Sequence, residues 1–498
     1  MSVTYDDRTR QAIPRCLSYE TACLLGLLRV NRRQEQVHRN EVKDSDASRQ
    51  WIENPRTSTA VDVVAEALIL KDFESSEAIK AAKYILRKGS SSSPLIRQLA
   101  DHFLGKIETP LSILREPEEI PDTDSQRIEI ARLKRSVRNY PVNPIAWSDL
   151  SLNYATVGQA DKAKMAMNVA MSLAKSNRFV LRSASRCFLH FEEPDRAVDI
   201  LNKSGLCAID PWIASAEIAI AESKGLKSKC ISKAKDLIED DNLTPFSRGE
   251  LAASLGTMEI KNGSIRRAKK IMRKAIIDPT ENALAQVEWA SSIHDIDFND
   301  MIELRKSVPA SYEATAVHTY YSKEFAESLK ASKKWGRFQF LSSRPIIHST
   351  FIASSMLNDD LGAIDIFDNA LPVQKESPLA INNYAFALAR VGRTGEAEDK
   401  VRECINRASR EEELALTATT GLICFREGNV GGGRRLYNIA VNGFELLKNY
   451  RSAAIAEYYW AVEEKRIKSE NAENKIREAK KAIEQHNVFG FEDLAKKL

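Results

Sequence analysis

Apolar and polar residues recur with a helical period over most of this chain. Residues 143–175 predict a helix, a turn at Gly158 and a second helix, because each half carries one apolar stripe at helical spacing. The first stripe consists of Trp147, Leu150, Ser151 and Tyr154, and the second of Ala163, Met167, Ala170 and Ala174. Two short helices cannot bury both stripes alone, so the pattern predicts stacked copies of one hairpin in which these residues pack.

Further copies keep the same internal phase when Trp147 is numbered position 4 and Gly158 position 15. Glycine returns at position 15 as Gly263, Gly392 and Gly428. Small residues return at positions 8, 20 and 27, where two helices must approach closely. These are Gly256, Ala268, Ala275, Ala363, Ala370, Ala385, Ala397, Cys404, Gly421, Gly433 and Ala440.

This order of residues resembles the tetratricopeptide repeat, a helical hairpin of about 34 residues. The order is a large aromatic residue, Leu, a small residue, Tyr, a turn Gly, Ala, a bulky apolar residue and Ala. This resemblance implies an all-α fold, an α-solenoid or superhelix of stacked helix-turn-helix hairpins, with a less regular helical N-terminal region. Residues 143–191, with the lead-in 13–28, are also similar to large bacterial repeat proteins of unassigned role. That similarity favours a bacterial origin and supplies no activity.

The pattern also divides the chain. The predicted parts are 1–55, an N-terminal region of open fold; 56–106, a helical region fitting at most a degenerate repeat; 107–125, a Pro-rich acidic linker; 126–282, a repeat array; 283–343, an irregular helical segment; 344–445, a second array; and 446–498, charged capping helices. Within 283–343, Trp335, Phe338 and Phe340 fit either a strand or aromatic packing between helices, and packing is favoured.

Composition indicates the class of protein and its cellular compartment, but it does not indicate a function. The chain has 498 residues, 43% hydrophobic and 29% charged, with a net charge of +4, which is ordinary for a soluble protein. Its seven Cys are isolated and odd in number, so we expect no disulfide framework and a reducing cytoplasm. No signal-peptide pattern or long apolar run occurs, so we expect no contact with a membrane.

The usual catalytic motifs are missing from the sequence. It contains no GxxxxGK[ST], GxGxxG, HExxH or GxSxG pattern, so we predict a protein that is not an enzyme and takes no cofactor. Cys187 and His190 are three residues apart, but two ligands in an apolar helix are more typical of packing than of a metal site. An enzyme hidden in the N-terminal region is the least favoured alternative.

The resemblance implies a concave groove lined by the first helix of each hairpin, which would hold a partner protein or peptide. The predicted function is therefore a non-catalytic scaffold or adaptor. Amides at the groove positions can bond a peptide backbone, guanidinium groups can hold a carboxylate, and apolar side chains can anchor a partner. The candidate groove residues are His348, Met356, Asn382, Asn383, Phe386, Arg390, Phe425 and Arg426. Packing against the next repeat is the competing interpretation for the apolar ones.

Two basic runs, residues 224–235 and 261–274, raise an alternative function. The second run places six cations on one predicted outer helix, a ridge able to meet phosphates of nucleic acid. These are Arg266, Arg267, Lys269, Lys270, Arg273 and Lys274. The competing interpretation is a solvated outer face, because few aromatic residues accompany the charges. The partner's identity and the oligomeric state stay open at this level.

Overall fold

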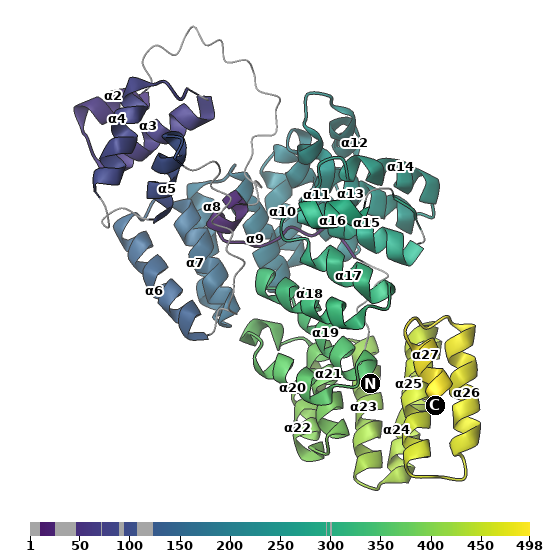
Figure 1. The fold of residues 1–498 in the computed structure, drawn as a ribbon. Helices are drawn as coiled ribbons and strands as arrows, with labels where there is room; N and C mark the ends of the chain where they lie inside the picture. The colour runs from purple at the N-terminus through teal and green to yellow at the C-terminus, as the bar shows by residue number, and fades with distance from the viewer. Residues whose placement is uncertain are drawn as a thin grey trace. The chain divides into compact units, whose positions relative to one another are not determined.

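A computed structural model describes residues 10–24, 46–70, 72–88, 94–106, 123–294, 296–298 and 301–498. Contacts divide the chain into two units, one of Met1–Asn31 with Pro121–Leu498 and one of Arg32–Ile120. Regular structure in the described residues is helical, and they contain no β-strand (Figure 1). The predicted all-α class is confirmed.

The smaller unit holds four described helices: α2 (Asp46–Glu53), α3 (Thr57–Leu70), α4 (Ser76–Arg87) and α5 (Pro94–Phe103). Helix α4 begins where the side chain of Ser75 accepts the amide hydrogen of Ala78, the preferred way to satisfy a first-turn donor. Its core is made of small and aromatic side chains, with the Trp51 ring edge-on to Tyr84 at 5.0 Å.

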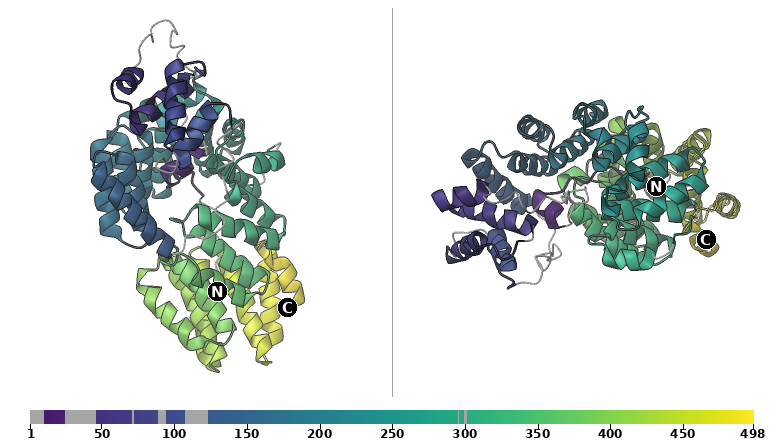
Figure 2. Two further views of the ribbon diagram at one scale, coloured as in Figure 1. Left: turned by 60° about the vertical axis from the view of Figure 1, so that its left-hand side comes forward. Right: turned by 90° about the horizontal axis from the view of Figure 1, so that it is seen from above.

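The larger unit begins with residues 10–18, which have no regular structure, and then runs through helices almost without interruption (Figures 1 and 2). Its helices are α1 (Tyr19–Leu24), α6 (Thr123–Asn139), α7 (Pro144–Thr156), α8 (Ala160–Leu173), α9 (Arg178–His190), α10 (Pro194–Lys203), α11 (Pro211–Ser223), α12 (Ile231–Glu239), α13 (Pro245–Lys261), α14 (Ile265–Ala275), α15 (Glu281–His294), α16 (Met301–Ser307), α17 (Tyr312–Tyr321), α18 (Phe325–Phe338), α19 (Arg344–Phe351), α20 (Asp360–Asp368), α21 (Pro378–Arg390), α22 (Thr394–Cys404), α23 (Arg410–Arg426), α24 (Val430–Leu446), α25 (Tyr450–Arg466), α26 (Ala472–Gln485) and α27 (Phe491–Lys497). A π-helical turn, Ile352–Met356, continues α19.

The turn residue of the predicted repeat is visible in the backbone. Gly158, Gly263, Gly392 and Gly428 all have φ between +74° and +89°, the left-handed region that glycine enters without steric cost. Each sits between the two helices of a hairpin, which confirms the repeat phase read from these glycines. Lys323 has the same geometry (φ 62°) between α17 and α18, so the stretch expected to be irregular contains a hairpin with a polar turn residue.

Close packing within each hairpin explains the small residues. Ala163, Met167 and Ala170 are all fully buried on α8, as the stripe predicts. A Cβ atom placed on Gly433 would lie 2.4 Å from the ring of Phe425, well inside van der Waals contact. The first helices of successive hairpins also contact one another, as α11, α13, α15 and α17 do. The stacked hairpins confirm the predicted α-solenoid fold.

One expectation about this unit is corrected, and one of two alternatives is excluded. Cys207 and Cys230 form a disulfide with Cα atoms 5.7 Å apart, although their sequence separation gave no sign of pairing. The short helix Leu206–Ala208 and the turn before α12 bring them together. The strand alternative is wrong because α18 runs through Phe338, whereas packing is confirmed by the fully buried Trp335.

Long apolar helices are absent from the described part of the chain. None of the helices in it combines the length and hydropathy that crossing a bilayer requires.

Candidate peptide-binding site

The N-terminal segment, defined here as residues 10–17, lies in extended form against the first helices of the central hairpins. Six of its eight residues are buried: Arg10, Gln11, Ala12, Pro14, Cys16 and Leu17. Ala12 joins the core formed around α13 and α15, and Cys16 joins the core around α7. The segment therefore spans the inner face of several repeats.

Side-chain amides of α15 hold the backbone of this segment. Asn282 donates from Nδ2 to the carbonyl of Ile13 at 3.1 Å, and Gln286 donates from Nε2 to the carbonyl of Arg10 at 2.8 Å. Both amide side chains are fully buried, and Gln286 also donates to Thr257 on α13 at 2.6 Å. Because these bonds go to main-chain atoms, they recognise an extended peptide whatever its side chains.

Carboxylates of α15 and α17 hold the two arginines of the segment. Arg10 makes a two-pronged contact with Glu313 at 2.8 and 3.0 Å, and Arg15 does the same with Glu281 at 2.8 and 3.1 Å. Arg15 also reaches Glu313 at 2.5 Å, and Arg344 approaches the same carboxylate at 3.0 Å. Paired forks of this kind fix direction as well as charge. Glu281, Asn282, Gln286 and Glu313 together are called the docking surface below.

Burial and charge act in opposite directions on these carboxylates. Burial by itself raises the pKa of Glu313, but the charges and hydrogen bonds of Arg10 and Arg15 outweigh it and lower that pKa to about 2. For Glu281 burial is the larger influence and raises the pKa, although Arg15 opposes it. Glu313 is therefore the ionised centre of the contact, with three guanidinium groups around it.

The docking surface was missed because α15 and α17 lie in the stretch whose sequence pattern is irregular. The ten residues from Glu281 to Ala290 are all buried. A helix buried on every side is expected to be apolar, so Glu281, Asn282, Gln286 and Glu288 in one such helix signal internal partners. That signal is in the sequence, but the identity of the partners is not.

The groove residues predicted in the C-terminal repeats pack against neighbouring repeats in the structure. Five of them are buried: His348, Asn382, Asn383, Phe386 and Phe425. Asn383 donates to the carbonyl of Ile347 at 3.1 Å, and Asn382 accepts from the hydroxyl of Thr419 at 2.8 Å. These amides are occupied by adjacent first helices, and their contact with a partner stays a prediction.

Aromatic side chains close the inner face of these C-terminal repeats. Tyr459 on α25 bonds to Ser355 at 2.8 Å and packs edge-on against Phe386 with ring centres 4.7 Å apart. Phe491, at the start of α27, is fully buried and lies 6.4 Å from Phe351 and 5.3 Å from Tyr458. The end of the chain thus covers α19 and α25 from the inside.

The three remaining candidates are partly exposed. Arg390 pairs with Asp360 at 3.2 Å, and Arg426 pairs with Glu463 at 2.7 Å. A Cβ atom on Gly490 would lie 2.9 Å from the sulfur of Met356, so the C-terminal segment covers this methionine. Both guanidinium groups already have carboxylate partners within the chain, and their contact with a partner stays a prediction.

The predicted basic ridge lies on α14, the second helix of its hairpin. Arg266, Arg267, Lys270 and Arg273 are exposed there; Lys269 and Lys274 are partly buried. Two of the six have acidic partners, Arg267 with Glu259 at 3.3 Å and Lys274 with Glu239 at 2.6 Å. Lys224 and Lys261, from the same two runs, instead line a cavity beside the N-terminal segment. The structure therefore separates residues that the sequence placed in one cluster.

Nothing in the described residues gathers three or more His, Cys, Asp or Glu side chains into a group able to hold a metal ion. Cys187 is buried with its sulfur 3.7 Å from the hydroxyl of Ser151. Burial, aided by the charge of Arg186, lowers the pKa of His190 to about 4. The imidazole of His190 packs against the ring of Phe191, with ring centres 5.0 Å apart.

No family model and no curated protein matches this chain. Solved structures of helical proteins do resemble it. They include yeast Tom70 at 14% identity, covering 88% of this chain and 95% of that one with a TM-score of 0.35. The Cut9–Hcn1 tetramer of the APC/C matches at 11% identity, covering 90% of this chain and 98% of that one with a TM-score of 0.33. Naa15/Naa10 bound to HypK matches at 12% identity, covering 86% of this chain and 68% of that one with a TM-score of 0.22. Likeness at this level carries no functional argument. The chain's own fold defines its class, an all-α solenoid of helical hairpins.

Proposed function

We propose that this protein is a non-catalytic scaffold that binds an extended, arginine-containing segment of a partner protein on its docking surface. One observation carries the proposal: the docking surface already holds such a segment, residues 10–17, by both backbone and side chains. The chain's own segment then acts as an internal occupant that a partner peptide displaces. A separate occupant needs only the same extended backbone and two arginines five residues apart.

A peptide exchange experiment tests the proposal. The full chain with Arg10→Ala and Arg15→Ala should release its own segment, because both buried ion pairs are lost. A fluorescent peptide of residues 10–20 should then bind this variant at least about tenfold more tightly than it binds the unaltered protein, read by anisotropy. The same peptide with both arginines replaced by alanine should not bind.

Two controls make this result specific. Arg266→Ala with Arg267→Ala removes the same charge from the exposed face of α14 and should leave peptide binding as in the unaltered protein. Adding Asn282→Ala and Gln286→Ala to the released variant should abolish the gain in peptide affinity, since the side-chain amides that donate to the peptide backbone are gone. If the released variant keeps its circular dichroism spectrum and still fails to bind the peptide, the docking surface is not a peptide site.

A partner in the cell is sought with the same variants. Pull-down from native lysate should recover a stoichiometric protein more efficiently with the released variant than with the unaltered chain. For the groove predicted from the C-terminal repeats, Asn383→Ala with Arg390→Ala should lose that protein while helical content is unchanged. Retention of the partner would confine binding to the docking surface.

Nucleic-acid contact is the second candidate, favoured by the exposed cations of α14. Binding to DNA or RNA should weaken steeply with salt and fall on charge reversal at Arg267 and Lys270. Absence of binding at low salt would end this candidate. It uses α14, which carries only the control substitutions of the peptide experiment, so the two results are independent.

A further inference from the structure

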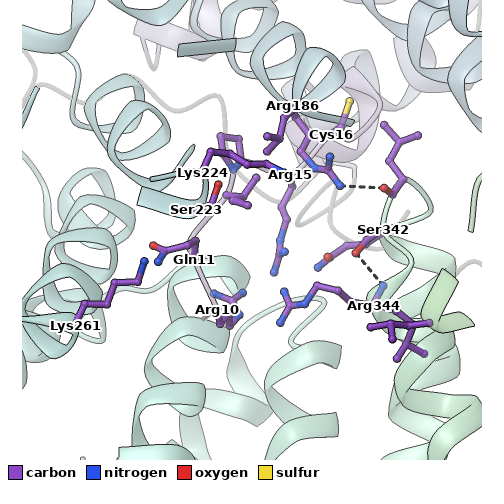
Figure 3. A pocket seen from close by; sticks show the side chains of 17 residues that line it. Arg10, Gln11, Arg15, Cys16, Arg186, Ser223, Lys224, Lys261, Ser342 and Arg344 are labelled. Atoms are coloured by element: carbon purple, nitrogen blue, oxygen red, sulfur yellow. Dashed lines mark hydrogen bonds between the residues drawn. The ribbon is translucent and has the colours of Figure 1, made fainter. Parts of the chain in front are cut away.

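A cavity of about 460 Å³ lies between the N-terminal segment and the repeats (Figure 3). Arg10, Gln11, Arg15 and Cys16 form one wall. Another is formed by residues around the junction of α18 and α19: Gln339, Leu341, Ser342 and Arg344. Arg186 projects from α9, while Lys224 follows α11 and Lys261 ends α13. The cavity therefore exists only where the segment and several repeats meet.

The lining is strongly cationic. Six of its side chains are basic: Arg10, Arg15, Arg186, Lys224, Lys261 and Arg344. Among the described residues that line it, there is no Asp or Glu. In Figure 3 the guanidinium groups of Arg10, Arg15 and Arg344 converge on one region.

Carboxylates behind the lining offset only part of this charge. Glu313 forms ion pairs with Arg10 and Arg344, and Glu281 forms one with Arg15. The carboxylate of Glu222 lies 3.6 Å from the ammonium group of Lys261. These three carboxylates pair with four of the six cations, Arg10, Arg15, Arg344 and Lys261. Buried positive charge in excess is costly unless an anion compensates it, so the site favours a negatively charged ligand.

Arg186 is the clearest case of this excess. It donates to the carbonyl of Leu341 at 2.9 Å, a neutral partner. Burial lowers its pKa, and the positive charge of neighbouring Arg15 acts in the same direction. A guanidinium group has five N–H donors, so one bond to a carbonyl leaves others able to bind a ligand. The planar arrangement of these donors matches the oxygen atoms of a phosphate group.

We propose that this cavity binds a small polyanion carrying phosphate groups. Arg186 and Arg344 contact it inside the cavity, and Lys224 and Lys261 contact it at the exposed rim. The cavity volume falls in the range of about 300 to 1,000 Å³ that small-molecule sites occupy. Because residues 10–16 supply one wall, the bound anion stabilises the docked segment. The inference rests on the cavity as it stands with the segment docked, and it does not require that a partner peptide displace the segment.

Pyrophosphate is the probe for the test, titrated calorimetrically into the full chain at constant ionic strength. One site per chain is expected. Lys224→Ala with Lys261→Ala should weaken binding by at least about tenfold, because two nearby charges are lost. Arg186→Gln should weaken it comparably. Single-site binding that neither change affects would overturn the proposal.

The matched control is Lys227→Ala with Lys229→Ala, which removes the same charge from exposed lysines of the same loop that do not line the cavity. This control should change affinity less than about twofold. An equal loss in control and cavity variants would mean that pyrophosphate responds to net charge only. No binding by the unaltered chain at millimolar pyrophosphate would also overturn the proposal.

Trypsin cleavage after Arg15 locates the bound anion. Saturating pyrophosphate should slow this cleavage at least about tenfold in the unaltered chain, relative to a chloride control of equal ionic strength. Cleavage that stays at the control rate while pyrophosphate is bound would place the anion elsewhere. Neither readout uses the fluorescent peptide, so failure here and failure of the peptide exchange are distinguishable.

Discussion

The inner faces of the central and C-terminal repeats are both covered by an end of the chain, but by different physical means. In the central repeats an extended segment is held by buried amides and by Arg10 and Arg15 on carboxylates. In the C-terminal repeats Phe491 and Tyr459 fill the inner face with rings. Polar contacts of the first kind specify direction and register and need a matching peptide, whereas ring packing of the second kind buries apolar surface.

Phe491→Ala should have the largest effect on this contrast. Removing a fully buried ring leaves a cavity between α19 and α25 and should lower the free energy of unfolding by about 3 to 5 kcal/mol. Chemical denaturation measures this loss. Leu446→Ala, at a side chain 84% exposed on α24, is the control and should be nearly neutral. A near-neutral Phe491→Ala would mean that α27 does not close the inner face.

Glu313→Gln should open the central face with a somewhat smaller loss. The amide keeps some hydrogen bonding, but Arg10, Arg15 and Arg344 lose their shared negative charge, so docking of the segment should weaken by about 3 kcal/mol. The rate of tryptic cleavage after Arg15, followed by mass spectrometry, should rise well over tenfold. Glu327→Gln, on the exposed side of α18, should leave that rate unchanged. Equal cleavage in both variants would contradict the role given to Glu313.

The two regions should also differ in their response to pH. Burial lowers the pKa of His348 to about 3, so the folded state disfavours the charge that the unfolded chain takes up below pH about 6.5. The stability that neutral His348 supports is therefore complete above pH 6.5 and falls by about 2 kcal/mol at pH 5. Urea unfolding at pH 7 and pH 5 measures the slope, which His348→Gln should reduce; an unchanged slope would count against a buried neutral imidazole.

The contribution of Glu313 to docking of the N-terminal segment should be insensitive over the same pH range. The pKa of Glu313 is lowered to about 2 in the folded state, so its contribution is complete above the unfolded value of about 4.3 and is lost only between about pH 4.3 and 2. Hydrogen exchange of residues 10–17, corrected for its intrinsic pH dependence, should show equal protection at pH 7 and pH 5. Lower protection at pH 5 would point to Glu281, whose pKa is raised by burial, as the titrating group.

Asn282→Ala should give the smallest effect. It removes the donor to the carbonyl of Ile13 and an acceptor of Arg10, which should weaken docking by about 1 to 2 kcal/mol and raise cleavage after Arg15 about tenfold. Asn383→Ala is the comparator, because this amide bonds the carbonyl of Ile347 in the C-terminal repeats. It should lower overall stability and leave cleavage after Arg15 unaltered, and a rise in that cleavage would mean the two faces are coupled.

Prediction from sequence was strong for the repeat and weak for the site. The left-handed Gly158 and Gly263 and the buried Met167 follow directly from spacing, because a hairpin needs a turn residue and an apolar stripe. Asn382 and Asn383 show why spacing then fails. Their spacing predicts side chains that face the groove, but both are fully buried and bond to the first helices of adjacent repeats.

By itself the sequence determined the helical class, the hairpin phase and the small residues at close contacts, because these depend on neighbours within about one repeat. Only the tertiary structure decided which inner face is occupied and by what. Arg10 and Glu313 are 303 positions apart, and the whole of helix α11 lies between Cys207 and its partner Cys230. Contacts at such separation depend on how successive hairpins stack, and local periodicity carries no information about that.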